Sequence, residues 1–403
     1  MSKYDAIVIG AGHNGLTNAA YLAKSGLKVL LLEKNDYIGG AAVSRVLHDG
    51  WTYSNCSYVC SLLRPEIFRD LNLQKYGLQV LAYGGSVTFM ENGDIFGGYS
   101  DADMFRREIS RFSKKDADAY VRFSRDVARQ CRFIKPMLLR TPPDPTSFKP
   151  KDLGELIYLF KRLYSLGEQT IYDTIRFYTM SVAEYLEEYF ETDVIKAALS
   201  GSGIIGTGLG PYSPGTAYVL LHHYMGEVDG SIGSWGYARG GMGAISNALA
   251  GAFQDHDGEI KKESEVSQII VKNGRAKGVV LANGDEYYAK NVVSNLDVKR
   301  TYQKLFDPKD LSKKILKQVD NFKIRGSSGK LNIALDGLPE FPAMGEKNPL
   351  IYADMHFIDS LERMERAFDD WKNGRWSRDP YTDVLLPTMT DPTMSPPGKH
   401  YMS

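Results

Sequence analysis

Three glycines near the start of the chain have the spacing that brings a phosphate group close to the backbone. Gly10, Gly12 and Gly15 form a G-x-G-x-x-G pattern. In such a loop the first glycine permits a tight turn, the second leaves room for a pyrophosphate, and the third lets a helix pack closely on a strand. The first N–H groups of that helix then face the phosphate charge. A lone pattern of this kind also occurs in ordinary loops, so its surroundings decide its meaning.

The residues around the loop have the order of a dinucleotide-binding unit. Residues 5–9 are apolar and β-branched, residues 16–23 have helical spacing, and residues 28–32 form a second apolar run. This pattern predicts a strand, a turn, a helix and a second strand. Glu33 follows at the end of the second strand, where a carboxylate accepts hydrogen bonds from ribose and repels a 2′-phosphate. FAD or NAD is therefore favoured over NADP.

A glycine pair, Gly39 and Gly40, follows the acid after five residues. It resembles the second signature of FAD proteins built like glutathione reductase and amine oxidase, in which the chain passes close to the flavin pyrophosphate. FAD is thus the expected cofactor, and NAD is the alternative.

Composition indicates an ordinary globular protein. The chain has 403 residues, which is long enough for two domains, and it is 43% hydrophobic and 24% charged. The 49 Lys and Arg balance 49 Asp and Glu, so we expect no nucleic-acid partner. Three cysteines are too few for a disulfide framework, no signal peptide precedes the first strand, and no run of ~18 apolar residues occurs. We expect the cytoplasm or another reducing intracellular compartment.

The second half of the chain contains a second set of strands that rejoins the first. Residues 266–272, 276–281 and 286–289 are joined by Asn-Gly pairs and predict a three-stranded meander, after which residues 291–295 return to the parallel sheet. The expected fold is α/β: a Rossmann FAD-binding domain, like that of glutathione reductase, interleaved with an α+β substrate domain. We assign residues 1–75 and 229–325 to the first, and residues 76–228 and 326–403, with a helical insert, to the second.

The second domain contains three local signals. Asn92-Gly93 predicts the turn of a hairpin, Ser181 with Glu184 predicts a capping box that opens a helix, and residues 201–215, with six glycines and two prolines, predict a loop. The tyrosine-rich helical insert fits an apolar substrate pocket.

Other candidate sites are weaker. Gly240, Gly241 and Gly243 precede a helical pattern without an apolar strand directly before them, so we do not expect a second nucleotide site there. Cys56 and Cys60 have a C-x3-C spacing that is not typical of redox dithiols. No metal site is expected, because the adjacent His222 and His223 of an apolar helix point to different faces.

The segment at 152–167 has apolar residues at helical spacing beside Lys161 and Arg162. Two interpretations remain open. The segment is either a helix of the domain core with a solvated basic edge or a helix that contacts a membrane surface peripherally.

These landmarks together resemble the phytoene-desaturase-like branch of FAD-dependent oxidoreductases, which includes pyridine nucleotide-disulfide oxidoreductase-domain proteins related to carotenoid desaturases and isomerases. The resemblance covers essentially the whole chain. It rests on VIGAGHNGL (8–16), LLEKNDYIGGAAVS (31–44), SLLRPEI (61–67), GGMGAISNAL (240–249) and the meander ending in VVSNLD. It implies that the FAD contacts are Gly10, Gly12, His13, Asn14, Gly15, Glu33, Lys34, Gly39, Gly40 and, through its backbone at the adenine, Val266.

The sequence departs from the wider superfamily at two places. Relatives often have arginine after the glycine pair, whereas this chain has Ala41, and Arg45 is the candidate to compensate. Such proteins also close with a glycine-rich strand and helix over the flavin ring, while this sequence ends in PPGKHYMS. Either the chain is a fragment or the flavin site is incomplete, and we expect the flavin bound by these residues to be half-enclosed.

The expected activity is that of an FAD-dependent oxidoreductase in which a C–H bond of a small, apolar substrate delivers hydride to the flavin. The chemistry belongs to the cofactor, and the sequence identifies no catalytic residue. Two alternatives are an NAD-dependent dehydrogenase and a non-catalytic flavin-binding or regulatory protein. Identifying the bound nucleotide would discriminate among them: FAD supports the first, NAD the second, and no nucleotide a flavin-poor regulatory protein.

Overall fold

A six-stranded sheet carries the glycine loop. The computed structural model describes residues 3–165, 167–345, 348, 350 and 353–403. In it the sheet has the order β11-β2-β1-β14-β13-β12. The strands are β1 (Tyr4–Ile9), β2 (Val29–Leu32), β11 (Glu259–Lys261), β12 (Val266–Lys272), β13 (Arg275–Leu281) and β14 (Glu286–Ser294). The predicted α/β fold with a Rossmann-like parallel sheet is therefore confirmed.

The sheet unites two stretches that are far apart in the sequence. Ala6 in β1 lies opposite Val29 in β2 on one side and Asn291 in β14 on the other, and all three strands run parallel. The predicted return of the meander to the parallel sheet is confirmed. β14 is one strand of nine residues that pairs with β13 at its start and with β1 along the rest of its length. The meander is thus continuous with the parallel sheet.

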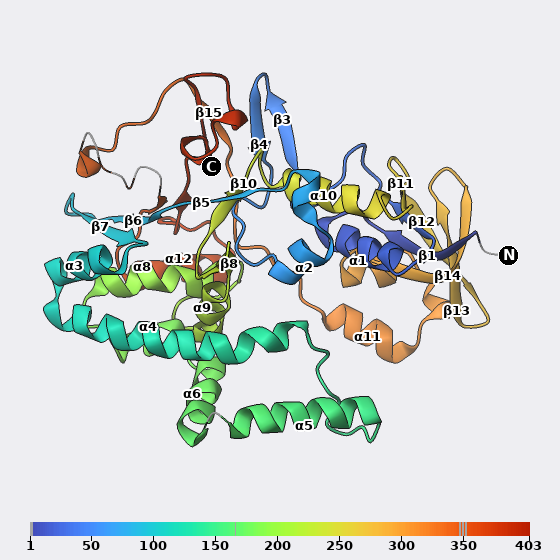
Figure 1. Ribbon diagram of the computed structural model, residues 1–403, viewed down its shortest axis with the longest axis horizontal. Coiled ribbons are helices and arrows are strands. Elements are labelled where there is room, and N and C mark those ends of the chain that lie inside the picture. Colours follow the sequence, from blue (N-terminus) through green and yellow to red (C-terminus); the bar gives the residue numbers. More distant parts are fainter. Residues whose placement is uncertain (1–2, 166, 346–347, 349, 351–352) are drawn as a thin grey trace.

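Apolar residues cover both faces of the parallel strands, as is typical of such sheets. On one face Ala6, Val8 and Leu31 pack against α1 (His13–Lys24) and α10 (Gly243–Gln254), which lie side by side in Figure 1. On the other face Ile7 and Leu30 pack against the meander. The parallel strands are therefore buried on both faces, by the helices on one and by the meander on the other.

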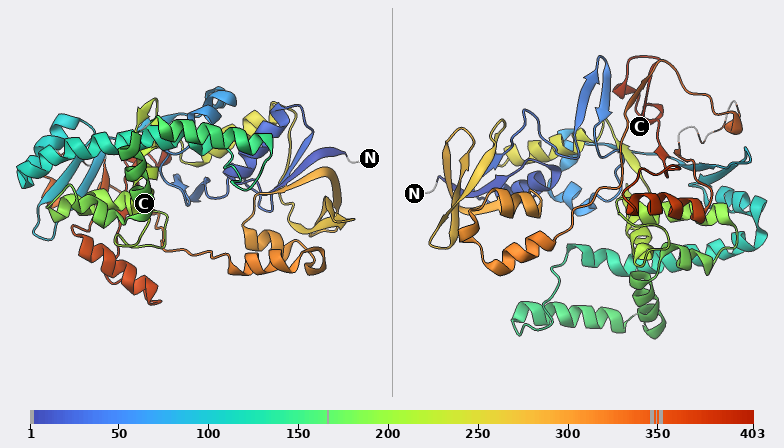
Figure 2. Two further views of the ribbon diagram at one scale, coloured as in Figure 1. Left: turned by 90° about the horizontal axis from the view of Figure 1, so that it is seen from below. Right: turned by 180° about the vertical axis from the view of Figure 1, so that it is seen from behind.

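A second, four-stranded sheet lies beyond the first, with the order β17-β16-β6-β7. The predicted hairpin at Asn92-Gly93 is present, and β6 also pairs in parallel with β16 from the last part of the chain. The strands are β6 (Gly85–Phe89), β7 (Ile95–Tyr99), β16 (Asp354–His356) and β17 (Asp383–Val384). The meander and this sheet lie toward opposite ends of the long axis (Figures 1 and 2).

Short strands and helices connect the two sheets. The small strands β5 and β10 pair in an antiparallel manner, and Cys60 bridges to Gly236 at the start of β10. This pair joins the stretch 76–228, which contains β5, to the stretch 229–325, which contains β10. The connecting elements are β3 (Ser44–His48), β4 (Trp51–Ser54), α2 (Pro65–Asp70), β5 (Val80–Ala82), β8 (Glu227–Val228), β9 (Ser231–Ile232), β10 (Gly236–Ala238), α11 (Lys313–Asn321), β15 (Ile333–Leu335), α12 (Leu361–Lys372) and β18 (His400–Met402).

A helical layer covers the second sheet and has its own core around Phe123. Its helices are α3 (Ala102–Phe112), α4 (Lys114–Ile134), α7 (Val182–Glu187), α8 (Asp193–Ile204) and α9 (Thr216–Tyr224). The predicted capping box opens α7, because Ser181 and Glu184 exchange both hydrogen bonds. The expected loop at 201–215 begins later than predicted. Gly201 and Gly203 belong to α8. Tyr381 packs against Gly201 and Val182 packs against Gly203, in the space that a side chain would occupy.

Two helices lie at the edge of this layer: α5 (Pro150–Tyr164) and α6 (Gly167–Thr179). α5 is outside both sheets in Figures 1 and 2, and none of its residues is buried. The interpretation of this segment as a domain-core helix is therefore wrong. Among the described helices, none is both long and apolar enough to cross a bilayer.

Candidate functional site

The glycine loop closes around the N-terminus of α1. Gly10 has φ +92°, a turn conformation that side chains rarely adopt. At Gly15 an added Cβ would overlap the carbonyl oxygen of Gly10, so helix and strand touch there. The Gly39 N–H donates to Ala11 O at 2.8 Å, and an added Cβ on Gly40 would lie 3.0 Å from the Gly12 Cα. The two glycine motifs of the sequence therefore form one bare backbone surface.

The N-terminus of α1 has no side-chain cap among the described residues and no acid in its first turn. α10, which is also led by glycines, differs. There the N–H groups of Met242 and Gly243 donate to the hydroxyl oxygens of Ser54 and Ser44 at 3.0 and 2.9 Å. The partial positive charge of α1 is thus available to an external anion, whereas that of α10 is satisfied internally. Of the two glycine-led helix starts, the first is therefore the one with unused N–H groups.

Glu33 is buried at the carboxyl end of β2, beside the loop. Its Oε2 accepts the Ala11 N–H at 2.9 Å, and its Oε1 accepts the Asn35 backbone and side-chain N–H groups at 3.0 and 2.9 Å. The carboxylate is therefore fixed in orientation. Oε2, with one hydrogen bond from the protein, retains capacity to accept a ribose hydroxyl.

The remaining predicted residues lie around this centre. Val266 starts β12 and is buried, and the Ser264 N–H two residues earlier donates to Glu33 O at 2.8 Å, which brings the two predicted adenosine contacts together. Asn14 and Lys34 are exposed, so they point toward solvent rather than into the loop. His13 is half-buried, and its Nδ1 has no hydrogen-bond partner within the described part of the chain.

From the glycine pair, the chain at 41–58 follows the N-terminal half of α10 toward the second sheet. Ser246 Oγ donates to Ala42 O at 2.7 Å, which fastens the start of this segment. Arg45, the candidate to replace the missing arginine, is exposed and stacks on the Tyr37 ring at 4.5 Å. At the end of the segment Lys330 Nζ donates to Ser54 O at 2.6 Å.

Lys330 was not identified by the sequence pattern, although its environment is unusual. Burial lowers the pKa of its ammonium group to about 8, and the ring of Tyr58 lies 5.3 Å away. A lysine of this kind holds or releases a proton near neutral pH. The isolated Gly329-Lys330 sequence gives no such signal, because the burial comes from residues near position 54.

A second polar cluster, Asp354, His356 and Asp383, lies where the second sheet meets this segment. His356 Nε2 is 3.2 Å from Asp383 Oδ1 and 3.5 Å from Asp354 Oδ2, and Tyr58 OH donates to Asp383 Oδ2 at 3.0 Å. Burial raises the pKa of Asp354, and the charge of Asp383 adds to the effect. For His356 burial opposes the charged form, but the two carboxylates outweigh it and raise its pKa.

This cluster was also missed by sequence reasoning. The available signal was the D-x-H spacing at 354–356, because residues two apart on a strand share a face. Nothing in the sequence pairs it with Asp383, which is 27 positions further along the chain than His356. The prediction of no metal site rested on the adjacent histidines His222 and His223 and did not consider these carboxylates.

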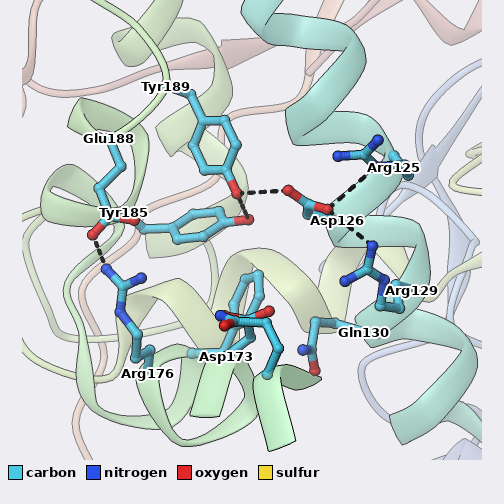
Figure 3. Close-up of a pocket in the computed structure, with 11 residues that line it drawn as sticks. Arg125, Asp126, Arg129, Gln130, Asp173, Arg176, Tyr185, Glu188 and Tyr189 are labelled. Atoms are coloured by element: carbon cyan, nitrogen blue, oxygen red, sulfur yellow. Dashed lines mark hydrogen bonds and ion pairs between the residues drawn. The ribbon is translucent and has the colours of Figure 1, made fainter. Parts of the chain in front are cut away.

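A cleft of about 320 Å³ opens between α4, α6 and α7 (Figure 3). Asp126 is its central acid: Arg125 and Arg129 lie 3.5 Å from its Oδ1, and Tyr189 OH donates to its Oδ2 at 3.1 Å. Across the cleft Arg176 pairs with Glu188. Because each of these arginines has an acidic partner, the cleft has no excess of positive charge. It is not the apolar substrate pocket that the tyrosine-rich sequence predicts.

The geometry agrees with the relatives of this chain. Residues 15–400 match the family described as flavin containing amine oxidoreductase. Pyridine nucleotide-disulfide oxidoreductase domain-containing protein 2 of Mus musculus is 34% identical over 430 residues, which span 100% of this chain and 73% of that protein. The chloroplastic prolycopene isomerase of Daucus carota is 29% identical and is matched over 60% of its length by 99% of this chain.

Solved structures show the same fold. An oxidoreductase from Methanosarcina mazei superposes with a TM-score of 0.59 at 17% sequence identity, covering 98% of this chain and 77% of that one. The predicted family resemblance is confirmed by both the sequence and the fold. The chain therefore belongs to the flavin-containing amine oxidoreductase family.

Proposed function

We propose that this protein is an FAD-dependent oxidoreductase that oxidises a C–H bond of a small, apolar substrate. The single observation that carries the proposal is the bare surface formed by Gly12, Gly39 and Gly40 at the uncapped N-terminus of α1. A pyrophosphate needs both close backbone approach and unused N–H donors, and this surface offers both. Glu33 would hold the ribose. Bound FAD would supply the hydride acceptor.

The chain's own residues then orient the cofactor. Glu33 and the loop would hold the adenosine half, and the segment 41–58 leads from the glycine pair along α10 to Ser54 and Lys330. Lys330 is the candidate for holding or moving a proton there, because burial keeps its pKa about 8. Tyr58 lies between this lysine and Asp383. These contacts support a proton-handling region at the junction of the two sheets.

The nucleotide released from the purified protein tests the proposal. Denaturation followed by chromatography and mass spectrometry should yield FAD. Release of NAD would favour the dehydrogenase instead. If no nucleotide is released and titrated FAD does not bind, the protein is a non-catalytic relative.

We also propose that α5 contacts a membrane surface peripherally. Its exposed apolar residues Leu153, Ile157, Phe160 and Tyr164 follow a spacing of four, three and four, which places them on one face. Phe148, just before the helix, is 90% exposed. Three exposed lysines flank this face: Lys149, Lys151 and Lys161. Aromatic and aliphatic groups beside lysines are typical of helices that lie in the interface of anionic bilayers.

A further inference from the structure

We propose that Asp354, His356 and Asp383 form a binding site for a divalent transition-metal ion such as Zn²⁺ or Mn²⁺. The three side chains offer one imidazole nitrogen and two carboxylate oxygens, and the potential ligand atoms all lie within 4.8 Å of one another. The site is independent of the dinucleotide surface at α1. Its role is structural, tying the second sheet to the segment that leads from the glycine pair.

The strands place the ligands without help from flexible loops. Asp354 and His356 are two apart in β16 and therefore share a face, while Met355 between them packs into the core on the opposite side. Asp383 in β17 lies directly opposite His356 in the antiparallel register. Paired strands hold such cross-strand neighbours in a fixed relation. The site is thus set by the backbone before an ion binds.

The spacing of the donors fits a metal ion better than it fits hydrogen bonding. Ligands bound at about 2.1 Å in tetrahedral or octahedral geometry lie roughly 3.0 to 3.4 Å apart. His356 Nε2 is 3.2 and 3.5 Å from its two carboxylate neighbours. Yet within the described part of the chain both ring nitrogens of His356, together with Asp354 Oδ1 and Asp383 Oδ1, lack a partner of hydrogen-bonding geometry. An ion bound between this nitrogen and these oxygen atoms would account for their close approach without hydrogen bonds.

Charge balance points the same way. The side chains of Asp354, His356 and Asp383 are only 16, 10 and 15% exposed, so two carboxylates have been removed from water. Buried charges need an opposite charge close by. A proton on His356 leaves this cluster with one net negative charge. A divalent ion with neutral imidazole makes the cluster neutral, and neutral imidazole with carboxylates is a donor set that zinc and manganese accept.

The surroundings supply the support that bound ligands usually have. Tyr58 OH donates to Asp383 Oδ2 at 3.0 Å and would orient this carboxylate, as outer-shell partners of metal ligands do. The Tyr381 ring lies 5.5 Å from the His356 ring. Since Tyr58 belongs to the segment after β4, an ion held here would join that segment to β16 and β17. Three protein ligands leave at least one position for water.

Metal content and thermal stability test the proposal on the full chain. The purified, tag-free protein is treated with a chelator, then given Zn²⁺ or Mn²⁺ and passed through gel filtration. We expect about one ion per chain and a higher melting temperature, because an ion that binds only the folded state stabilises it. Asp383→Asn should lose most of this ion and the accompanying shift. His256→Gln, which changes an exposed histidine elsewhere, should retain both.

Co²⁺ substitution of the wild-type chain locates the ion even where a variant fails to fold. A spectrum without a thiolate charge-transfer band is expected, since the proposed ligands are nitrogen and oxygen. Such a band would place the ion on the cysteines and overturn the proposal. Wild-type protein without stoichiometric metal and without a shift in melting temperature would also overturn it, leaving a protonated His356 as the cation. So would equal metal binding by wild-type protein and Asp383→Asn.

Discussion

Glu33 shows how one side chain can serve both the fold and a ligand. Its carboxylate accepts N–H groups from Ala11 in the glycine loop and from Asn35 in the following turn. These bonds hold the loop against the end of β2, and they also fix the oxygen that would meet ribose. The sequence predicts the acid from its place after an apolar strand. It does not show that the same oxygen closes the loop.

Glu33→Ala should weaken FAD binding by roughly 1 to 3 kcal/mol, because hydrogen bonds to a charged acceptor are lost. Glu33→Gln keeps one acceptor oxygen and should weaken binding less. Fluorescence titration of the nucleotide-free protein measures both. An unchanged dissociation constant in Glu33→Ala would mean that the ribose does not bind here.

Gly12 and Gly15 should respond differently to the same substitution. At Gly12, φ is −66° and an added Cβ would lie 3.1 Å from the flexible Asn295 side chain, so Gly12→Ala should fold. The methyl group would nevertheless occupy the space that the pyrophosphate needs, and FAD retention should fall at least about tenfold, a loss of about 1.4 kcal/mol. Gly15→Ala should instead lower the melting temperature, because its Cβ overlaps the backbone of Gly10. Flavin content and thermal melts separate these effects, and undiminished flavin in Gly12→Ala would contradict the site.

Lys330 should make the free energy of unfolding depend on pH in the alkaline range. Its folded-state pKa is lowered from 10.5 to about 8 by burial, so the unfolded chain binds more protons between these values. Stability should therefore rise with pH across this window. Lys330→Met should be more stable than the wild type near pH 7, and the difference should shrink toward pH 10. Lys314→Met, at an exposed lysine of α11, is the control. Thermal melts that show a difference independent of pH would argue against a desolvated ammonium group.

At the scale of elements, α1 and α10 show the limit of motif reasoning. Both follow glycines and contain alanine-rich faces that pack together. The two helices differ because the hydroxyl oxygens of Ser54 and Ser44 accept hydrogen bonds from the first N–H groups of α10. These serines lie 188 and 199 residues before their partners in the sequence. No local pattern shows these partners. The sequence expectation rested on the absence of a strand before Gly240, and the structure contradicts it there, because β10 (Gly236–Ala238) precedes this glycine.

α5 gives a prediction at this scale. The protein should sediment with vesicles of phosphatidylcholine and phosphatidylserine, and less with phosphatidylcholine alone, because lysines flank its apolar face. Phe160→Ser combined with Phe148→Ser should reduce this binding. Trp376→Ser, an equally exposed aromatic site outside α5, should not. Vesicle binding that is the same in all three proteins would exclude α5 as the contact.

At the scale of the whole molecule, the sequence was most informative where signals are local and repeated. The first strand, the glycine loop, the Asn-Gly turns and the capping box at Ser181 are set by residues a few positions apart, and each occurs as predicted. The second sheet was only half predicted, because β16 and β17 are three and two residues long and pair with strands far away. Strands this short have no periodicity to detect. The Lys330 environment and the Asp354, His356 and Asp383 cluster depend on those pairings, and this is why they were missed.

The same interleaving makes cofactor binding a property of the whole molecule. The dinucleotide surface draws on residues 10–15, 33, 39–40 and 264–266, which come together only when β1, β2 and β12 are assembled. Because an unfolded chain lacks this surface, FAD should raise the free energy of unfolding by about 2.7 kcal/mol at a hundredfold excess over its dissociation constant.

Thermal melts of nucleotide-free protein with FAD, NAD or neither compare the three proposed classes directly. We expect a shift with FAD, little with NAD, and a clearly smaller FAD shift for Gly12→Ala. An FAD shift of undiminished size in Gly12→Ala would place the nucleotide outside the glycine loop. A shift with NAD alone would favour the dehydrogenase, since Glu33 by itself accepts the ribose of either cofactor and only the surface at Gly39 and Gly40 favours the flavin.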